Sequence, residues 1–154
     1  MLDDSLRAFL EGGLAIHIGS RTGSLEPNGA RAAAVKVEDA VHFRVYVAEV
    51  AAARVLPDLR ANGQAAVVFV RPADDRACQI KGMFLSARRA KAVEREIVAA
   101  QWDAFLANLE RIGIPRAMSR GWISWPAVAV RLRASAVFDQ TPGPGAGAPM
   151  QTPS

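Results

Sequence analysis

Apolar residues along this chain come mostly in short runs that alternate with polar ones, a pattern typical of β-strands. In residues 14–21, "LAIHIGSR", Ile16 and Ile18 share one face, while His17 and Gly19 share the other. The same reasoning predicts further strands at residues 29–40, 40–49, 64–72, 76–89 and 127–140.

Three segments instead repeat their apolar residues at helical spacing. The first is residues 2–10, and the second is residues 50–63, where Pro57 predicts a kink or a late start. The longest helix is predicted from about Lys91 to Ile112, ending before Gly113. Its apolar stripe consists of Val93, Ile97, Val98, Trp102, Phe105, Leu106, Leu109 and Ile112.

The order of these elements predicts a mainly β fold. About six strands with one long helix inserted before the last strand favour a small antiparallel six-stranded β-barrel with capping helices. A parallel doubly wound sheet is excluded because the first hairpins have no helix between their strands. We expect a single domain over residues 1–140, followed by a flexible Pro/Gly-rich C-terminal arm over residues 141–154.

Composition narrows the environment and the partners. The 154-residue chain has one cysteine, acids rather than bases at its N-terminus, and no apolar run long enough to span a bilayer. We therefore expect a cytoplasmic protein with no membrane partner. The net charge of +4 raises nucleic acid as a partner. The basic residues are scattered, however, and suit an anionic small molecule at least as well, which makes nucleic acid unlikely.

Several kinds of chemistry lack their motifs. The sequence contains no nucleophile elbow, P-loop, HExxH or CxxC motif, and no metal-ligand spacing. Its two histidines, His17 and His42, lie inside predicted strands, where they are either ordinary wall residues or candidate haem ligands. The acidic pairs lie in turns.

One stretch, "GARAAAVKVEDA" at residues 29–40, suggests an anion site. Arg31 and Lys36 are cations suited to a phosphate, and the small residues Ala32–Ala34 suit the floor beneath a planar ring. Residues five apart point to opposite faces of a regular strand. The two cations therefore converge only if Arg31 lies in the turn after Gly29 or if a bulge intervenes. Otherwise both are solvated.

Four stretches carry a resemblance to a known family. They are Arg31-Ala-Ala-Ala-Val-Lys36, the passage 43–69 with Leu59, Asn62 and Phe69 in register, "CQIKG" at 78–82, and "VFDQTPGPGAG" at 137–147. Over roughly residues 6–140 the chain resembles the pyridoxamine 5′-phosphate oxidase-like family of flavin-binding split barrels. This resemblance implies a homodimer with FMN at its interface.

The same resemblance implies roles for individual residues. Arg31, Lys36 and Arg54 would hold the FMN phosphate, and Gln79 would hydrogen-bond the flavin ring. Lys81 shares a strand face with Gln79 and joins the candidate cofactor-binding set, although the two also suit an ordinary polar face. Trp122 would cover the ring from the partner chain.

The sequence also departs from the family. Where flavin-binding members place a serine or threonine and one or two lysines, this chain has "VAEVAAARV" at 47–55, with Arg54 as the only cation. It also lacks the C-terminal arginine-leucine-x-proline stretch of a true pyridoxamine-phosphate oxidase. We therefore expect an FMN-dependent oxidoreductase of another kind. The alternative is a non-catalytic split-barrel dimer that binds haem, a deazaflavin or another anionic small molecule, or no cofactor.

Overall fold

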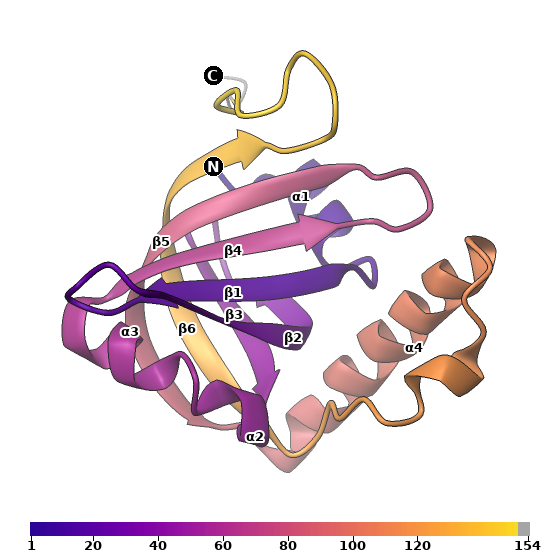
Figure 1. Cartoon of the computed structure of the whole chain (residues 1–154), viewed down its shortest axis with the longest axis horizontal. Helices are drawn as coiled ribbons and strands as arrows, with labels where there is room; N and C mark the ends of the chain where they lie inside the picture. Colours follow the sequence, from indigo (N-terminus) through magenta and orange to yellow (C-terminus); the bar gives the residue numbers. More distant parts are fainter. Residues whose placement is uncertain (151–154) are drawn as a thin grey trace.

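The computed structural model describes residues 1–150, in which six antiparallel strands close into a barrel in the order β1-β2-β3-β6-β5-β4 (Figure 1). The predicted mainly β class and the six-stranded split barrel with a long helix before the last strand are confirmed. The strands are β1 (Ala15–Arg21), β2 (Pro27–Val37), β3 (His42–Ala48), β4 (Gln64–Val70), β5 (Ala77–Arg89) and β6 (Ala127–Asp139).

Alternation along each strand fills the barrel interior. Side chains on one face of every strand are buried in a single apolar core, and those on the other face point outward. Fully buried members of this core include Ile16, Val35, Phe43, Val67, Phe69, Ile80 and Leu132. Burial of each such side chain contributes about 1.5–3 kcal/mol, so this core is the main source of stability.

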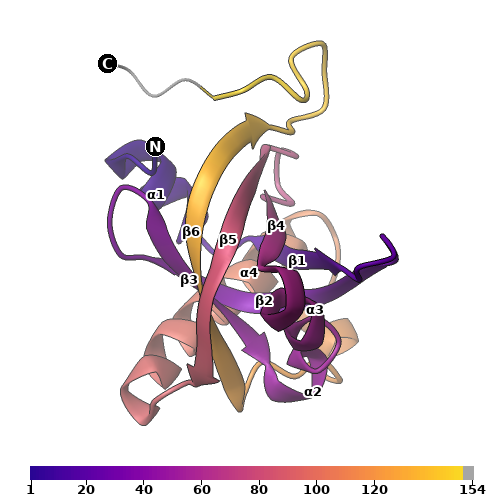
Figure 2. The ribbon, with the colours of Figure 1, turned by 90° about the vertical axis from the view of Figure 1, so that its left-hand side faces the viewer.

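Short helices close the two ends of the barrel (Figures 1 and 2). At one end α1 (Asp4–Leu10) buries Leu6, Phe9 and Leu10, and the side chain of Asp3 caps its first turn. At the other end lie α2 (Glu49–Ala52) and α3 (Leu56–Asn62). Pro57 occupies the first turn of α3, so the predicted late start is confirmed.

The long helix α4 (Arg95–Arg111) packs on the outer face of β2. It follows the 3₁₀ turn η1 (Ala92–Glu94) and precedes a second one, η2 (Arg116–Ser119). The predicted apolar stripe is wrong at both ends, because Val93 is 80% exposed and Ile112 is 48% exposed. The buried face of α4 instead includes two polar residues, Gln101 and Asn108. Within residues 1–150, no helix has both the length and the apolar character needed to cross a membrane.

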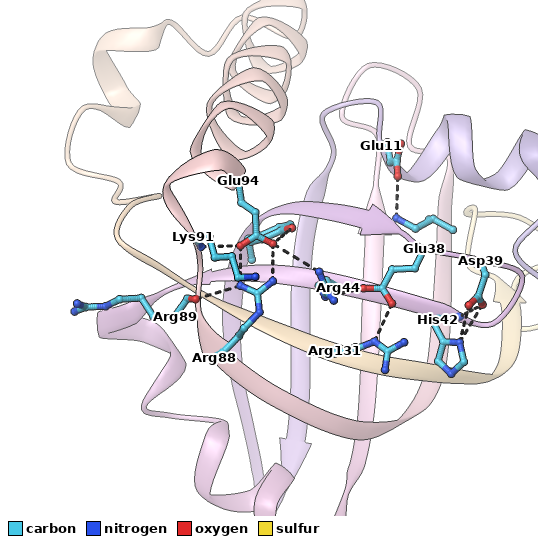
Figure 3. A network of polar contacts seen from close by, with 12 residues as sticks. Glu11, Glu38, Asp39, His42, Arg44, Arg88, Arg89, Lys91, Glu94 and Arg131 are labelled. Atoms are coloured by element: carbon cyan, nitrogen blue, oxygen red, sulfur yellow. Dashed lines mark hydrogen bonds and ion pairs between the residues drawn. The ribbon is translucent and has the colours of Figure 1, made fainter.

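A buried carboxylate fixes the start of α4 to the barrel wall (Figure 3). Arg88 donates to both oxygens of Glu94, at 2.7 and 2.8 Å, and the Tyr46 hydroxyl donates to Oε1 at 3.0 Å. The backbone N–H of Lys91 donates to Oε2 at 2.7 Å. Despite burial, the bonds from Arg88 lower the pKa of Glu94 to about 2. A neighbouring carboxylate, Glu38, pairs in the same way with Arg44 and Arg131.

The described part of the expected C-terminal arm returns to the barrel. After β6 the chain turns, and the Met150 N–H donates to the Val137 carbonyl at 2.8 Å. Pro149 forms an isolated bridge with Phe138. This part is therefore attached to the end of β6, whereas residues 151–154 of the expected arm lie outside the described residues.

Replacing Glu94 by Gln tests the role of this carboxylate. Because its folded pKa lies below the ordinary value of 4.5, its charge stabilises the fold above that pH, and this contribution disappears as the pH falls toward about 2. We expect Glu94→Gln to lower the free energy of unfolding by about 2 kcal/mol at pH 7 and by about 1 kcal/mol at pH 3. Urea unfolding at both pH values measures this difference. Asp103→Asn, at an exposed ion pair, serves as the control and should change little at either pH.

Candidate functional site

A bulge in β2 determines where Arg31 points. Arg31 lies within the strand, opposite His17 of β1, and not in the preceding turn. The pairing of β2 with β3 shifts between Ala32 and Ala34. The shift adds one residue to β2 and so reverses the alternation of inward and outward side chains. As a result, Arg31 and Lys36 both point outward despite their odd spacing. Of the two conditions set by the sequence, the bulge is therefore the one that is met.

Gln101 holds this bulge in place from α4. Its side-chain amide donates to the Val35 carbonyl at 2.7 Å, and its carbonyl oxygen accepts from the Val35 N–H at 2.9 Å. Both groups are buried, so the helix replaces the strand partner that these backbone groups would otherwise lack.

The alanines of this stretch have another role than the expected floor beneath a ring. Ala32 faces the barrel core. Ala33 and Ala34 face outward, but they are buried in a second apolar cluster with Val98 and Trp102 of α4. The prediction of a ring floor at Ala32–Ala34 is therefore wrong, because α4 occupies the space above them.

Lys36 lies apart from Arg31. It is exposed and lies opposite Arg44 of the neighbouring strand β3. Between the two predicted phosphate ligands lie Ala33 and Ala34, which α4 covers. Lys36 is consequently not part of the groove that contains Arg31.

Three of the predicted residues do meet in one groove of about 450 Å³ on the outer wall of the barrel. Arg31 comes from β2, Arg54 from the turn between α2 and α3, and Gln79 from β5. Strand pairing explains the gathering, because Arg31, His17, Val68 and Gln79 lie directly opposite one another on four successive strands. Barrel closure thus joins residues that are 48 positions apart in sequence (79 − 31).

Trp122 lies beside Arg31, next to this groove. The guanidinium carbon of Arg31 lies 4.6 Å from the centre of the Trp122 ring and 5.6 Å from that of Phe105. Both aromatic residues belong to the same chain as the arginine. The resemblance, in contrast, implies that Trp122 would cover the flavin ring from the partner chain. An adjoining cavity of about 570 Å³ is lined by Arg31, Arg54 and Trp122, together with the exposed apolar residues Val50 and Ile123.

The electrostatics of the groove favour an anion. No Asp or Glu lines the groove or the adjoining cavity, and within residues 1–150 neither Arg31 nor Arg54 forms an ion pair. Burial lowers the pKa of Arg31, as expected for a cation whose charge is partly desolvated. Burial and the charge of Arg31 lower the pKa of His17, which faces the same groove. The arrangement therefore offers uncompensated positive charge and a neutral imidazole.

The remaining candidates lie elsewhere. Lys81 lines a neighbouring cavity on the same wall. His42 is the first residue of β3, and its Nδ1 is 2.8 Å from Asp39 Oδ2, so of the two histidines only His17 faces the groove. Among residues 1–150, no group of three or more His, Cys, Asp or Glu side chains is arranged to hold a metal ion.

Sequence reasoning missed Gln101 and the intrachain contact of Trp122 with Arg31. For Gln101 a signal exists, because Gln101 and Asn108 are seven residues apart and interrupt the face of the helix that carries Val98 and Phe105. Polar residues on a buried helix face indicate hydrogen bonds to backbone groups. For Trp122 there is no local signal, since the loop that contains it shows no periodicity.

No protein-family model matches the sequence, and no curated protein sequence matches it. Solved structures do match its fold. HupZ from Group A Streptococcus superposes with a TM-score of 0.57 at 14% identity, over 96% of this chain and all of the other (100%). A candidate pyridoxamine 5′-phosphate oxidase from Lactobacillus delbrueckii gives 0.54 at 12% identity, over 89% and 93% of the two chains.

An FMN-binding protein from Syntrophomonas wolfei gives a TM-score of 0.55 at 8% identity, over 86% of this chain and 82% of that one. At these identities the likeness concerns the fold alone. The chain has the split-barrel fold of the pyridoxamine 5′-phosphate oxidase-like proteins.

Gln101→Leu tests the clamp on the bulge. The substitution keeps the size of the side chain but leaves a buried N–H and a buried carbonyl of Val35 without partners. We expect it to lower the free energy of unfolding by about 2–4 kcal/mol in urea titrations. Ala100→Leu, on the exposed side of the same helix, should leave stability nearly unchanged. Equal stability of Gln101→Leu and the wild type would show that the bulge does not depend on the helix.

Proposed function

We propose that this protein binds FMN in the groove between Arg31, Arg54 and Gln79. The observation that carries the proposal is the pair of arginines without ion pairs in a groove that no acid lines. Sites with one sign of charge attract oppositely charged ligands, and a phosphate accepts hydrogen bonds from guanidinium groups with particular strength. The sequence resemblance and the shared fold with an FMN-binding protein support the choice of a flavin.

Each residue has a defined task in this proposal. Arg54 supplies a guanidinium at the end of the groove, and Arg31 supplies a second, which stacking on Trp122 holds in one orientation. The Gln79 amide carries both donors and an acceptor, which suits the alternating carbonyl and N–H edge of a flavin ring. Small or short residues between them, such as Gly19 and Ala66, leave room for a flat group.

With FMN bound, the flavin would supply the redox chemistry, and the chain would supply binding and orientation. An oxidoreductase acting on a small molecule is therefore the proposed activity. A non-catalytic protein that binds a deazaflavin or another anionic small molecule is the alternative, because the same two arginines suit any phosphorylated ligand. Haem is a further alternative, for which His17 would be the ligand from the groove.

We also propose that two copies associate through the wall that carries the groove. In Figure 1 the strands β1 and β4 and the first part of β5 face the viewer with no helix in front of them. Along β4, Ala66, Val68 and Val70 point outward and are only partly buried. A small-residue, partly apolar surface of this kind suits a self-complementary dimer, which the sequence resemblance also implies.

Titration with FMN tests the cofactor. The wild type should quench flavin fluorescence at a 1:1 ratio, and the double variant Arg31→Gln, Arg54→Gln should weaken the affinity by about a hundredfold, because two charge-assisted contacts to the phosphate are lost. Lys36→Gln should change the affinity by less than about threefold, since Lys36 lies outside the groove.

The controls separate the alternatives. A loss in Lys36→Gln as large as in the double variant would place the phosphate along β2 and contradict the assigned groove. Absence of any flavin binding by the wild type, together with binding of a deazaflavin or with a Soret band on adding haem, would replace FMN by that ligand.

Val70→Asp tests the dimer. A charge on the exposed wall, at the end of β4, should dissociate two copies, which light scattering coupled to size-exclusion chromatography measures as a halved mass. Val93→Asp is the matched control, because Val93 is 80% exposed at the start of α4, away from this wall. A wild-type protein that is monomeric at high concentration would contradict the dimer directly.

A further inference from the structure

A second cavity lies on the same wall as the proposed FMN groove and continues it. It has a volume of about 530 Å³ and shares Gly19 and Ala66 with the groove. It lies over the end of β1, the starts of β2 and β4 and the middle of β5, and Trp122 does not line it. The proposed FMN site therefore opens at this end into further space that FMN binding at Arg31 and Arg54 does not require.

The shape of the cavity follows from strand pairing. Gly19 lies between Gly29 of β2 and Ala66 of β4, and Ala66 is paired with Lys81 of β5. Two positions further along β1, Arg21 points outward over the strand that carries Gln64. Short side chains thus form the floor, and the longer side chains of Arg21, Lys81 and Met83 form the sides. Met83 is 46% exposed and supplies an apolar contact.

The charge of the cavity is entirely positive. Arg21 donates through Nε and Nη2 to the neutral Gln64 amide oxygen, at 3.1 and 2.8 Å, and to the Thr22 carbonyl. Lys81 lies 5.2 Å from the ring centre of Phe138. Neither forms an ion pair within residues 1–150, and no Asp or Glu lines the cavity. The nearby carboxylate of Asp58 is buried, and it accepts hydrogen bonds from Ser20 and Asn28.

Several basic residues on the other side of the barrel are paired instead. Arg44, Arg88, Arg89 and Arg131 all have carboxylate partners on the other side of the barrel. Arg21 and Lys81 do not, although they lie beside a cavity large enough for a small organic molecule. A cavity with a mostly small and apolar floor and two free cations fits a flat apolar body that carries an anionic group.

We propose that this cavity binds the substrate of the FMN site, and that the substrate is a small organic anion with a flat, apolar body. Its carboxylate, sulfonate or phosphate group lies between Arg21 and Lys81, and its body lies beside Met83, next to the groove that holds FMN. The assignment as substrate rests on the proposed function, whereas binding of the anion does not.

The fluorescent probe 1-anilinonaphthalene-8-sulfonate has this combination of flat apolar rings and one anionic group. We expect the wild type to bind it at a 1:1 ratio with an increase in fluorescence. The double variant Arg21→Gln, Lys81→Gln should bind it about tenfold more weakly, because the charge-assisted contacts are lost. Arg60→Gln, at an exposed position of α3, is the control and should behave as the wild type. Thermal unfolding of each variant verifies that the fold is kept.

Two further measurements locate the probe and separate this inference from the FMN proposal. Arg31→Gln, Arg54→Gln should keep the probe affinity within about twofold, and Arg21→Gln, Lys81→Gln should keep the FMN affinity within about twofold. Unchanged probe binding in Arg21→Gln, Lys81→Gln would overturn the inference while leaving the FMN proposal intact. Probe binding that needs Arg21 and Lys81 in a protein without flavin affinity would support the anion site and overturn the flavin.

Discussion

The two hydrogen bonds between Gln101 and the backbone of Val35 are the interaction on which the rest of the site depends. They satisfy the backbone of Val35, directly after the shift in the pairing with β3, and so they stabilise the bulge at Ala32–Ala34. Through the bulge, Arg31 points to the outer wall while Val35 and Val37 point into the core. The same bonds hold α4 against β2, which places Phe105 beside the guanidinium of Arg31.

Charge is divided between the two sides of the barrel. On the side of β3 and β6, Glu38 and Glu94 are surrounded by arginines, and Glu94 fixes the start of α4 (Figure 3). On the side of β1 and β4, no carboxylate lines the groove or the cavities that adjoin it. The first arrangement stabilises the fold, since each charge has a partner. The second leaves positive charge available to ligands. Basic residues that are scattered along the sequence thus gather at one anion-binding wall.

Much of the fold was predictable because its signals are local. Period-two alternation located all six strands, and Pro57 marked the start of α3. At Gly82 the pairing with β6 shifts, and an added Cβ would lie 2.6 Å from the Arg133 carbonyl oxygen, which explains the glycine at this position. The apolar stripe of the long helix was less reliable, because exposed Val93 and buried Gln101 both depart from simple amphipathicity.

The sequence by itself determined the order of strands and helices, the mainly β class and the set of cations available for an anion, because hydrophobic period and turn residues act within a few positions. Only the tertiary structure decided which of those cations meet. Arg31, Arg54 and Gln79 come together through barrel closure, whereas Lys36 does not join them, although it shares a strand with Arg31. The physical reason is that the direction in which side chains point beyond a bulge depends on the partners of the strand. Here one partner is a glutamine 66 residues away, and no local pattern encodes such a contact.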